Sequence, residues 1–324
     1  MTIFNLLDGE YQLANDGFTY NSVIPRMKIG ETDSYNPWEI TEHSLVVVSM
    51  QDLVTTSGKN RTSYYYDIVE AGGFHEYFDL NETSNDVKFI LSSIIPDKMI
   101  YGLEPEDYVE VISSTGSDYF ITNDGETYIN DKYGEQNVLF ELDRIVEDTK
   151  YVQSRTDVPL IGLIKGTKPE HIVSHIYCLK KMGINQFCFH TSDFLRQHDK
   201  RTISIGKRLF QTARKHVPFL LAYGPCSRSS IKIFSSADGY ITFSHFPRGK
   251  VKYVNGRQKQ LPKSTEFDRK LIMSNLQDIC NTVKSVGLNQ ATLDKWEYTP
   301  SEGTSTYKWS DTAASYMINQ GCVI

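Results

Sequence analysis

The stretch PLIGLIKGTKPEHIVSHIYCLKKMGINQFCFH, residues 159–190, decides the fold. It begins with the apolar run 159–165, which predicts a buried strand. Pro169 then opens a helical segment that ends at Gly183, with proline and glycine at the helix positions that favour them. A second apolar run, 186–190, follows directly. A strand, a helix and a further strand joined by short loops predict two parallel strands with a helical crossover.

The same unit recurs along the chain. Further strands are predicted at 45–49, 118–122, 218–223 and 239–245, and helices at 104–116, 137–155, 201–216, 226–236 and 266–286. The series predicts an α/β fold, a (β/α)8 TIM-like barrel with C-terminal helices, as a single domain over residues 45–324. Residues 1–44, which are polar and irregular, are expected to form an N-terminal arm packed on it. A doubly wound open sheet remains the alternative, although no GxGxxG or P-loop sequence follows any strand.

Charge is strongly segregated. The 324 residues carry a net charge of −6, yet residues 150–270 hold 23 Lys and Arg against 7 Asp and Glu. This asymmetry favours a nucleic-acid partner bound by a basic face. The alternative is that these side chains only solvate the outer faces of amphipathic helices.

Membrane and disulfide signals are absent from the sequence. No apolar run is long enough to span a bilayer, and the N-terminus has no signal-peptide pattern. The five cysteines are scattered, without a CxxC pair, which fits neither a disulfide framework nor a zinc site. We therefore expect a cytoplasmic protein with no membrane partner, no metal and no cofactor.

Polar and titratable residues gather where the predicted strands end. In a (β/α) barrel these ends form the face that carries the chemistry. They include Asp124 after the strand 118–122, Lys165 and Gly166 after 159–164, and His190 with Ser192 and Asp193 after 186–189. Tyr223, Gly224 and His245 end later strands. Each residue alone could be a turn or cap residue, but their convergence predicts a site on this face.

Several segments resemble motifs of the tRNA-guanine transglycosylase superfamily. VEAGGFHEYFDL (69–80) resembles a motif of the form TDSGGFQVFSL, and IGLIKGT (161–167) is similar to FGIVQGG. The segments 87–128 and 219–245 resemble further family motifs, in the same order and at comparable spacing. The resemblance covers roughly residues 45–260, and implies a barrel that acts on the base–sugar bond of a nucleic acid. Shorter members that place deazaguanine bases in DNA are the nearer analogy.

The resemblance also implies residue roles. Glu70 takes the place of the Asp in DSGGF, a carboxylate at the reacting base, and Asp124 matches an Asp that hydrogen-bonds the base edge. Lys165, Gly166 and Gly224 match pocket positions. Ile241 stands where the family has its nucleophilic Asp, and Asp238 matches only the first Asp of that motif. The family's CxCxxC zinc site is missing.

These observations predict an enzyme that binds a flipped-out, modified base and cleaves its N-glycosidic bond. With Ile241 at the nucleophile position, water becomes the attacker, which favours a DNA glycosylase, with anti-phage defence as a natural use. Base exchange that inserts a deazaguanine into DNA or tRNA, and a non-catalytic nucleic-acid-binding barrel, remain alternatives. DNA is favoured over tRNA as the partner. Glu70 and Asp124 are the expected catalytic pair over one barrel mouth. The expected substrate-binding residues are Lys165, Gly166, His190, Tyr223, Gly224, Asp238 and His245, and the expected backbone contacts are Arg228, Arg248, Lys250 and Lys252.

Overall fold

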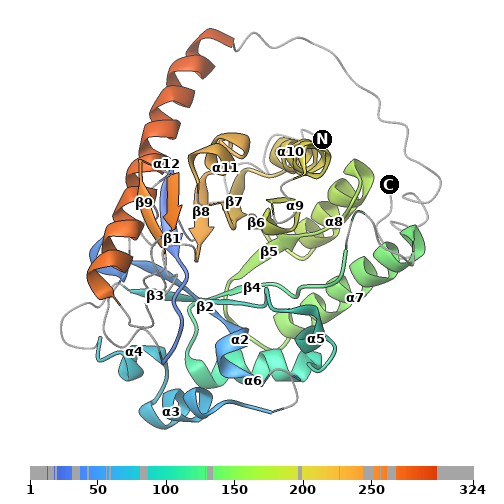
Figure 1. Ribbon diagram of the computed structural model, residues 1–324. Coiled ribbons are helices and arrows are strands. Elements are labelled where there is room, and N and C mark those ends of the chain that lie inside the picture. Colours follow the sequence, from blue (N-terminus) through green and yellow to red (C-terminus); the bar gives the residue numbers. More distant parts are fainter. Residues whose placement is uncertain are drawn as a thin grey trace.

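Eight parallel strands form a barrel in the computed structural model of the chain (Figure 1). The strands are β1 (Ser22–Pro25), β2 (Leu45–Ser49), β3 (Lys88–Ser92), β4 (Tyr119–Ile121), β5 (Leu160–Ile164), β6 (Gln186–His190), β7 (Phe219–Tyr223) and β8 (Gly239–Thr242). They are hydrogen-bonded in chain order from β2 to β8, and β1 lies beside β8. The backbone N–H of Met27 donates to the Val47 carbonyl at 2.8 Å, which joins the β1 end of the sheet to β2. The predicted (β/α)8 barrel is confirmed.

The structure describes most of the chain between residues 13 and 297. The described residues are 13, 18, 20–30, 37–41, 44–55, 57, 60–80, 87–127, 129, 134–195, 199–225, 227–243, 251–255, 257–260 and 268–297. Within this part, no helix is long and apolar enough to cross a membrane.

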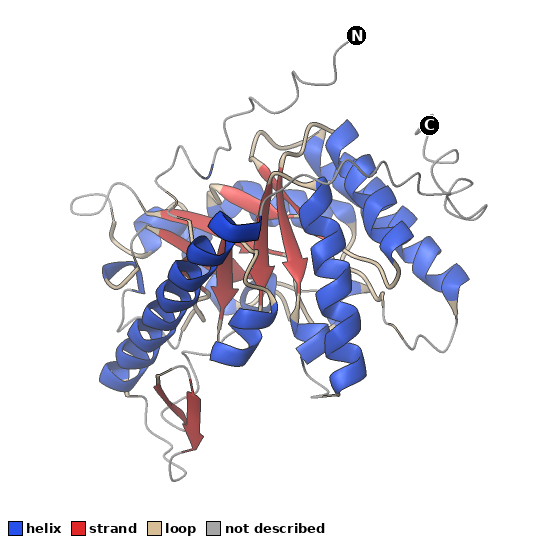
Figure 2. Ribbon diagram, turned by 90° about the horizontal axis from the view of Figure 1, so that it is seen from above, coloured by secondary structure: helices blue, strands red, loops and turns tan. Residues whose placement is uncertain are grey.

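Helices follow the strands and cover the outside of the barrel (Figure 2). They are η2 (Pro37–Glu39), α2 (Met50–Leu53), α3 (Ser63–Ala71), α4 (Phe74–Tyr77), α5 (Asp97–Ile100), α6 (Pro105–Thr115), α7 (Glu135–Gln153), α8 (Pro169–Lys181), α9 (Ser192–Leu195), α10 (Lys200–His216), α11 (Arg228–Ile233) and α12 (Arg269–Glu297). α6 shows how the sequence sets their limits. Pro105 occupies its first turn, and Gly116 ends it in the left-handed conformation, with φ 64°. An antiparallel hairpin of β9 (Val251–Val254) and β10 (Arg257–Gln260) precedes α12, which packs against β1 and α11.

Two layers of apolar side chains hold the barrel together. One fills its interior and includes Val47, Ile121, Leu163, Leu221 and Ile241. The other lies between the strands and the surrounding helices. Because both faces of each strand are buried, the strands read as continuous apolar runs, which is why the sequence revealed most of them.

The first strand differs from the expectation. Residues 1–44 were expected to form an irregular arm, but Ser22–Pro25 pairs with β8 in register from Ser22 opposite Gly239 to Pro25 opposite Thr242. The strand has only four residues, ends in proline and is flanked by polar sequence. So short a segment has no readable periodicity, and only its long-range partners define it.

Asp238 was expected to bind substrate, and the structure places it elsewhere. It precedes β8, at the end of the barrel where the strands begin. Its Oδ1 and Oδ2 accept from the Arg214 guanidinium at 3.1 and 2.9 Å, and Oδ2 also accepts from the Leu220 N–H at 2.7 Å. Burial raises the pKa of Asp238 despite the nearby Arg214. The residue links α10, β7 and β8 and has a structural role.

We expect Asp238→Asn to lower the free energy of unfolding by about 2–3 kcal/mol, because the amide cannot accept from both guanidinium nitrogens and leaves a partly buried charge without its partner. Urea denaturation measures the change. Asp157→Asn, at an exposed position on the same end of the barrel, is the control and should have almost no effect. Equal stability of the two variants would contradict the structural role.

Candidate functional site

A pocket of about 370 Å³ opens at the end of the barrel where the strands finish. Enzymes with this fold carry their reacting groups at this end. Its wall combines cationic, anionic and aromatic side chains with a short apolar segment after β3. The lining residues are Arg26, Gln51, Ile94, Ile95, Pro96, Asp97, Asp124, Lys165, His190, Ser192, Asp193, Tyr223, Gly224 and Phe243.

The structure brings five of the expected site residues to this pocket: Asp124, Lys165, His190, Tyr223 and Gly224. Gly166 lines a smaller adjoining hollow together with Lys165 and His190. They meet because each follows the end of a parallel strand, where the barrel geometry directs all strand ends to one face.

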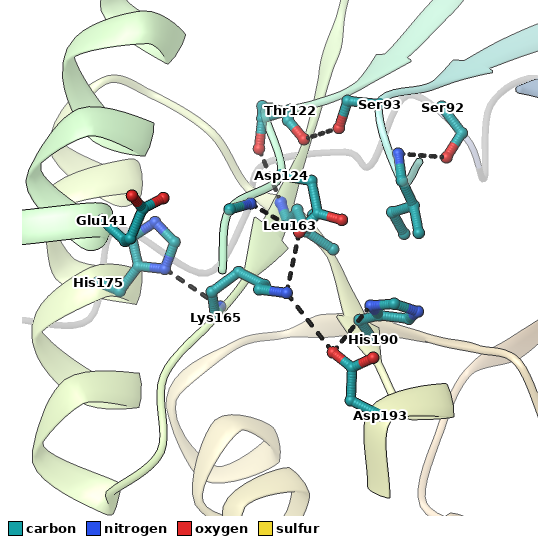
Figure 3. Close-up of polar contacts among 12 residues, drawn as sticks. Ser92, Ser93, Thr122, Asp124, Glu141, Leu163, Lys165, His175, His190 and Asp193 are labelled. Atoms are coloured by element: carbon teal, nitrogen blue, oxygen red, sulfur yellow. Dashed lines mark hydrogen bonds and ion pairs between the residues drawn. The ribbon is translucent and has the colours of Figure 1, made fainter. Parts of the chain in front are cut away.

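Lys165 is the centre of the polar cluster (Figure 3). Its Nζ lies 2.9 Å from Asp124 Oδ1 and 3.6 Å from Asp193 Oδ2, and the Lys165 side chain is only 5% exposed. Burial lowers the pKa of the ammonium. The nearby carboxylates of Asp124 and Asp193 raise this pKa by more than burial lowers it, so it lies above its ordinary value. Lys165 is therefore a fixed positive charge at neutral pH, which bridges two carboxylates of the pocket.

The backbone of Lys165 is held from behind by a histidine. The Lys165 N–H donates to His175 Nδ1 on α8 at 3.2 Å. His175 is completely buried, and burial lowers its pKa to about 4. The imidazole is therefore neutral at pH 7, as it must be to accept this hydrogen bond. This contact fixes the exit of β5.

His190 and Asp193 form a second pair on the same wall. His190 Nδ1 lies 3.2 Å from Asp193 Oδ2, at ion-pair distance, although the angle does not make a hydrogen bond. The His190 ring packs edge-on against Tyr223, whose buried Oη has no hydrogen-bond partner among the described residues.

The loop that carries Asp124 is fixed from two sides. Oδ1 of Asp124 accepts from the Gly125 N–H at 2.8 Å, and the Asp124 carbonyl accepts from Arg144 Nη2 at 3.1 Å. Arg144 itself pairs with Glu141 and Asp148, each at 2.9 Å. A Cβ on Gly125 would lie 2.9 Å from Glu141 Oε2, so a larger residue there would displace the Glu141 side chain. α7 therefore sets the position of the Asp124 carboxylate.

Glu70 does not reach the pocket, contrary to the expectation that it lies over the barrel mouth with Asp124. It is exposed near the end of α3. Gly72 caps that helix with φ 107°, and Phe74 then stacks on Phe89 near the start of β3. α3 therefore ends at the opposite end of the barrel from Asp124. The AGGF segment terminates a helix and anchors a core phenylalanine, which gives no support to a catalytic role for Glu70.

For four of the five remaining expected residues, the structure describes no side chain. His245, Arg248 and Lys250 lie outside the described residues, and Lys252 lies in β9, where only the backbone is described. Arg228 is exposed on the first turn of α11, after β7 and so on the pocket side. Ile241, at the place of the expected nucleophile, is fully buried in the barrel interior.

The basic segment covers the outside of one half of the barrel. Lys168, Lys200 and Arg201 begin helices on the pocket side, whereas Lys181 and Lys215 are exposed in the last turns of α8 and α10, at the opposite end. Part of the positive charge therefore faces the pocket rim, and part solvates outer helix faces.

Among the polar pocket residues, Arg26 and Asp97 were missed in the sequence, whereas Gln51, Ser192 and Asp193 were noticed at strand ends but not selected. Arg26 follows the unrecognised β1, Gln51 lies in the short α2, and Asp97 opens α5. Asp193 was among the polar residues found at strand ends, but it was not predicted to be a site residue. The usable signal was that polar residues directly after a strand line the pocket whatever their type.

No protein-family model matches the chain, and no curated protein is significantly similar to it. Among the described residues, no group of three or more His, Cys, Asp or Glu side chains is arranged to hold a metal ion.

The charge of Lys165 gives a test by pH. Because its pKa is raised in the folded state, its stabilisation is complete below the unfolded-state value of about 10.4 and is lost as pH rises through the higher folded value. We expect Lys165→Met to lower the free energy of unfolding by about 3 kcal/mol at pH 7, since two carboxylates lose their shared partner. The gap to the wild type should narrow only above about pH 10.

Urea denaturation at pH 7, 9 and 11 measures this gap. Lys180→Met is the control, because the Lys180 ammonium is exposed and donates only to the His216 carbonyl. A gap that closes below pH 9 would show that Lys165 is not held as a charged bridge.

Proposed function

We propose that the chain cleaves the N-glycosidic bond of a flipped-out base in a nucleic acid, by hydrolysis. The observation that carries this proposal is the cluster of Asp124, Lys165, His190 and Asp193 on one wall of the pocket. Cleavage of a base–sugar bond builds positive charge on the sugar, which a nearby carboxylate stabilises. A pocket of about 370 Å³ has the size of small-molecule sites and suits one extruded nucleotide.

The cluster suggests separate roles for its members. Asp124 supplies the carboxylate that stabilises the sugar cation, with Oδ1 anchored by Lys165 and the Gly125 N–H. His190, oriented by Asp193, takes the proton from the attacking water. The water oxygen bonds to C1′ of the sugar as the C1′–N bond breaks, and the base leaves with the bonding electrons and takes up a proton. Lys165 holds both carboxylates in place through its two ion pairs.

The burial of Ile241 favours hydrolysis over base exchange. The resemblance would place the nucleophile of a covalent intermediate on β8, and an isoleucine side chain in the barrel interior cannot fill that role. Exchange through Asp124 as nucleophile stays the second candidate, because the transglycosylase-like motifs are those of exchanging enzymes. A nucleic-acid substrate is supported by the basic side chains on the pocket side, among them Arg201 and Arg228.

The test incubates the protein with DNA that carries ordinary or modified bases and measures free base and alkali-labile abasic sites. Asp124→Asn should lower base release by about 10²–10³-fold, the usual cost of removing one group that stabilises charge in the transition state. Glu70→Gln is the matched control, a carboxylate at the other end of the barrel, and should keep full activity.

The outcomes separate the candidates. Incorporation of labelled guanine or deazaguanine without abasic sites would favour base exchange. If neither base release nor incorporation occurs, both enzymatic versions are wrong and the non-catalytic barrel remains. Loss of activity in Glu70→Gln with full activity in Asp124→Asn would reverse the site assignment.

A further inference from the structure

Arg26 has a fixed place at the pocket. It follows the last residue of β1, its N–H donates to the Thr242 carbonyl at 2.8 Å, and its backbone forms a bridge with Val47. The backbone of Arg26 is thus held between β8 and β2, at the end of β1, the strand that closes the barrel. Its side chain lines the pocket.

The guanidinium of Arg26 has no carboxylate partner among the described residues. The Nη2 of Arg26 donates to Gln51 Oε1 at 3.4 Å, and its Cζ lies 4.7 Å from the centre of the Phe243 ring. The buried Nε has no hydrogen-bond partner among the described residues. The other partly buried arginines differ, because Arg61, Arg144 and Arg214 each pair with one or two carboxylates. A half-buried guanidinium without an anion is costly, and it binds carboxylate or phosphate groups strongly.

Two acidic side chains of the pocket lie on the wall across from Arg26. In a closed ring of eight strands in chain order, β1 is opposite β5. Lys165 follows β5, with Asp124 and Asp193 at its ammonium. Asp97 also lines the pocket, after β3, which lies between β1 and β5 in the ring. The pocket therefore has a net acidic wall and a cationic wall.

We propose that Arg26, supported by Gln51, binds a phosphate group of the nucleotide whose base–sugar bond lies at Asp124. A planar guanidinium donates two parallel hydrogen bonds to a phosphate. A nucleotide matches the two walls, since its sugar becomes cationic in the reaction and its phosphate is anionic. This assignment rests on the proposed function, and it concerns binding, which is measured separately from base release.

The test measures binding by isothermal titration of four common deoxynucleosides, their 5′- and 3′-monophosphates, and inorganic phosphate. We expect at least one monophosphate to bind about 10-fold or more tightly than its nucleoside, as a charge-assisted hydrogen bond would give. Arg26→Gln should abolish that advantage and leave nucleoside affinity unchanged. Arg26→Lys should keep part of it. Arg155→Gln, an exposed arginine beyond the end of α7 at the opposite end of the barrel, is the matched control and should bind like the wild type.

Three outcomes would overturn the assignment. They are equal affinities for nucleoside and monophosphate, an advantage that survives in Arg26→Gln, and inorganic phosphate binding as tightly as the nucleotide. Base release from DNA that does not depend on Arg26 would leave the proposed function standing while this inference fails. Phosphate-dependent binding without any base release would leave this inference standing while the proposed function fails.

Discussion

The ammonium of Lys165 between Asp124 and Asp193 is the interaction on which the candidate site depends. A buried amine remains charged only where carboxylates compensate for its lost hydration, and the two carboxylates need the ammonium for the same reason. The ends of β4 and β5 and the start of α9 must therefore meet at one point. Supports outside the pocket, His175 behind Lys165 and Arg144 behind Asp124, keep them there.

The two-residue period of the strands explains how much of this site could be predicted from the sequence. In β5, Ile161 and Leu163 point into the barrel interior, and Lys165 continues the same row at its open end. The same step of two leads from Cys188 to His190 and from Leu221 to Tyr223. Long apolar runs are readable, so the residue that follows each run was readable too. Arg26 obeys the same rule, with Ile24 inside the barrel, but its strand has only four residues and ends in proline.

Glu70 shows the limit of an argument from matched letters. Its segment, SYYYDIVEAGGF, has Tyr65 and Ile68 three residues apart on the buried side, followed by a glycine at the helix end, and these are helix signals. A helix between two barrel strands runs back from the open end toward the strand starts, so a carboxylate in its last turn must lie far from the pocket. Periodicity and capping fit this position, whereas the resemblance does not. The expectation that Asp238 binds substrate is wrong for a related reason. A residue just before a parallel strand lies at the opposite end of the barrel from a residue just after one.

The fixed charge on Lys165 also limits the chemistry that the proposed enzyme performs. Enzymes that use a lysine as nucleophile on a sugar carbon or an abasic site need a free amine, and they lower the lysine pKa to obtain it. Here the two carboxylates raise the pKa of Lys165, and its hydrogen-bonding directions point to them. A Schiff base at Lys165 would first require the loss of both ion pairs. With Ile241 buried on β8, the proposal assigns the action on the sugar carbon to the Asp124 carboxylate and to a water molecule activated by His190. Hydrolysis that stops at the abasic sugar is therefore the outcome that this wall of the pocket favours, and a subsequent cleavage of the strand is not expected.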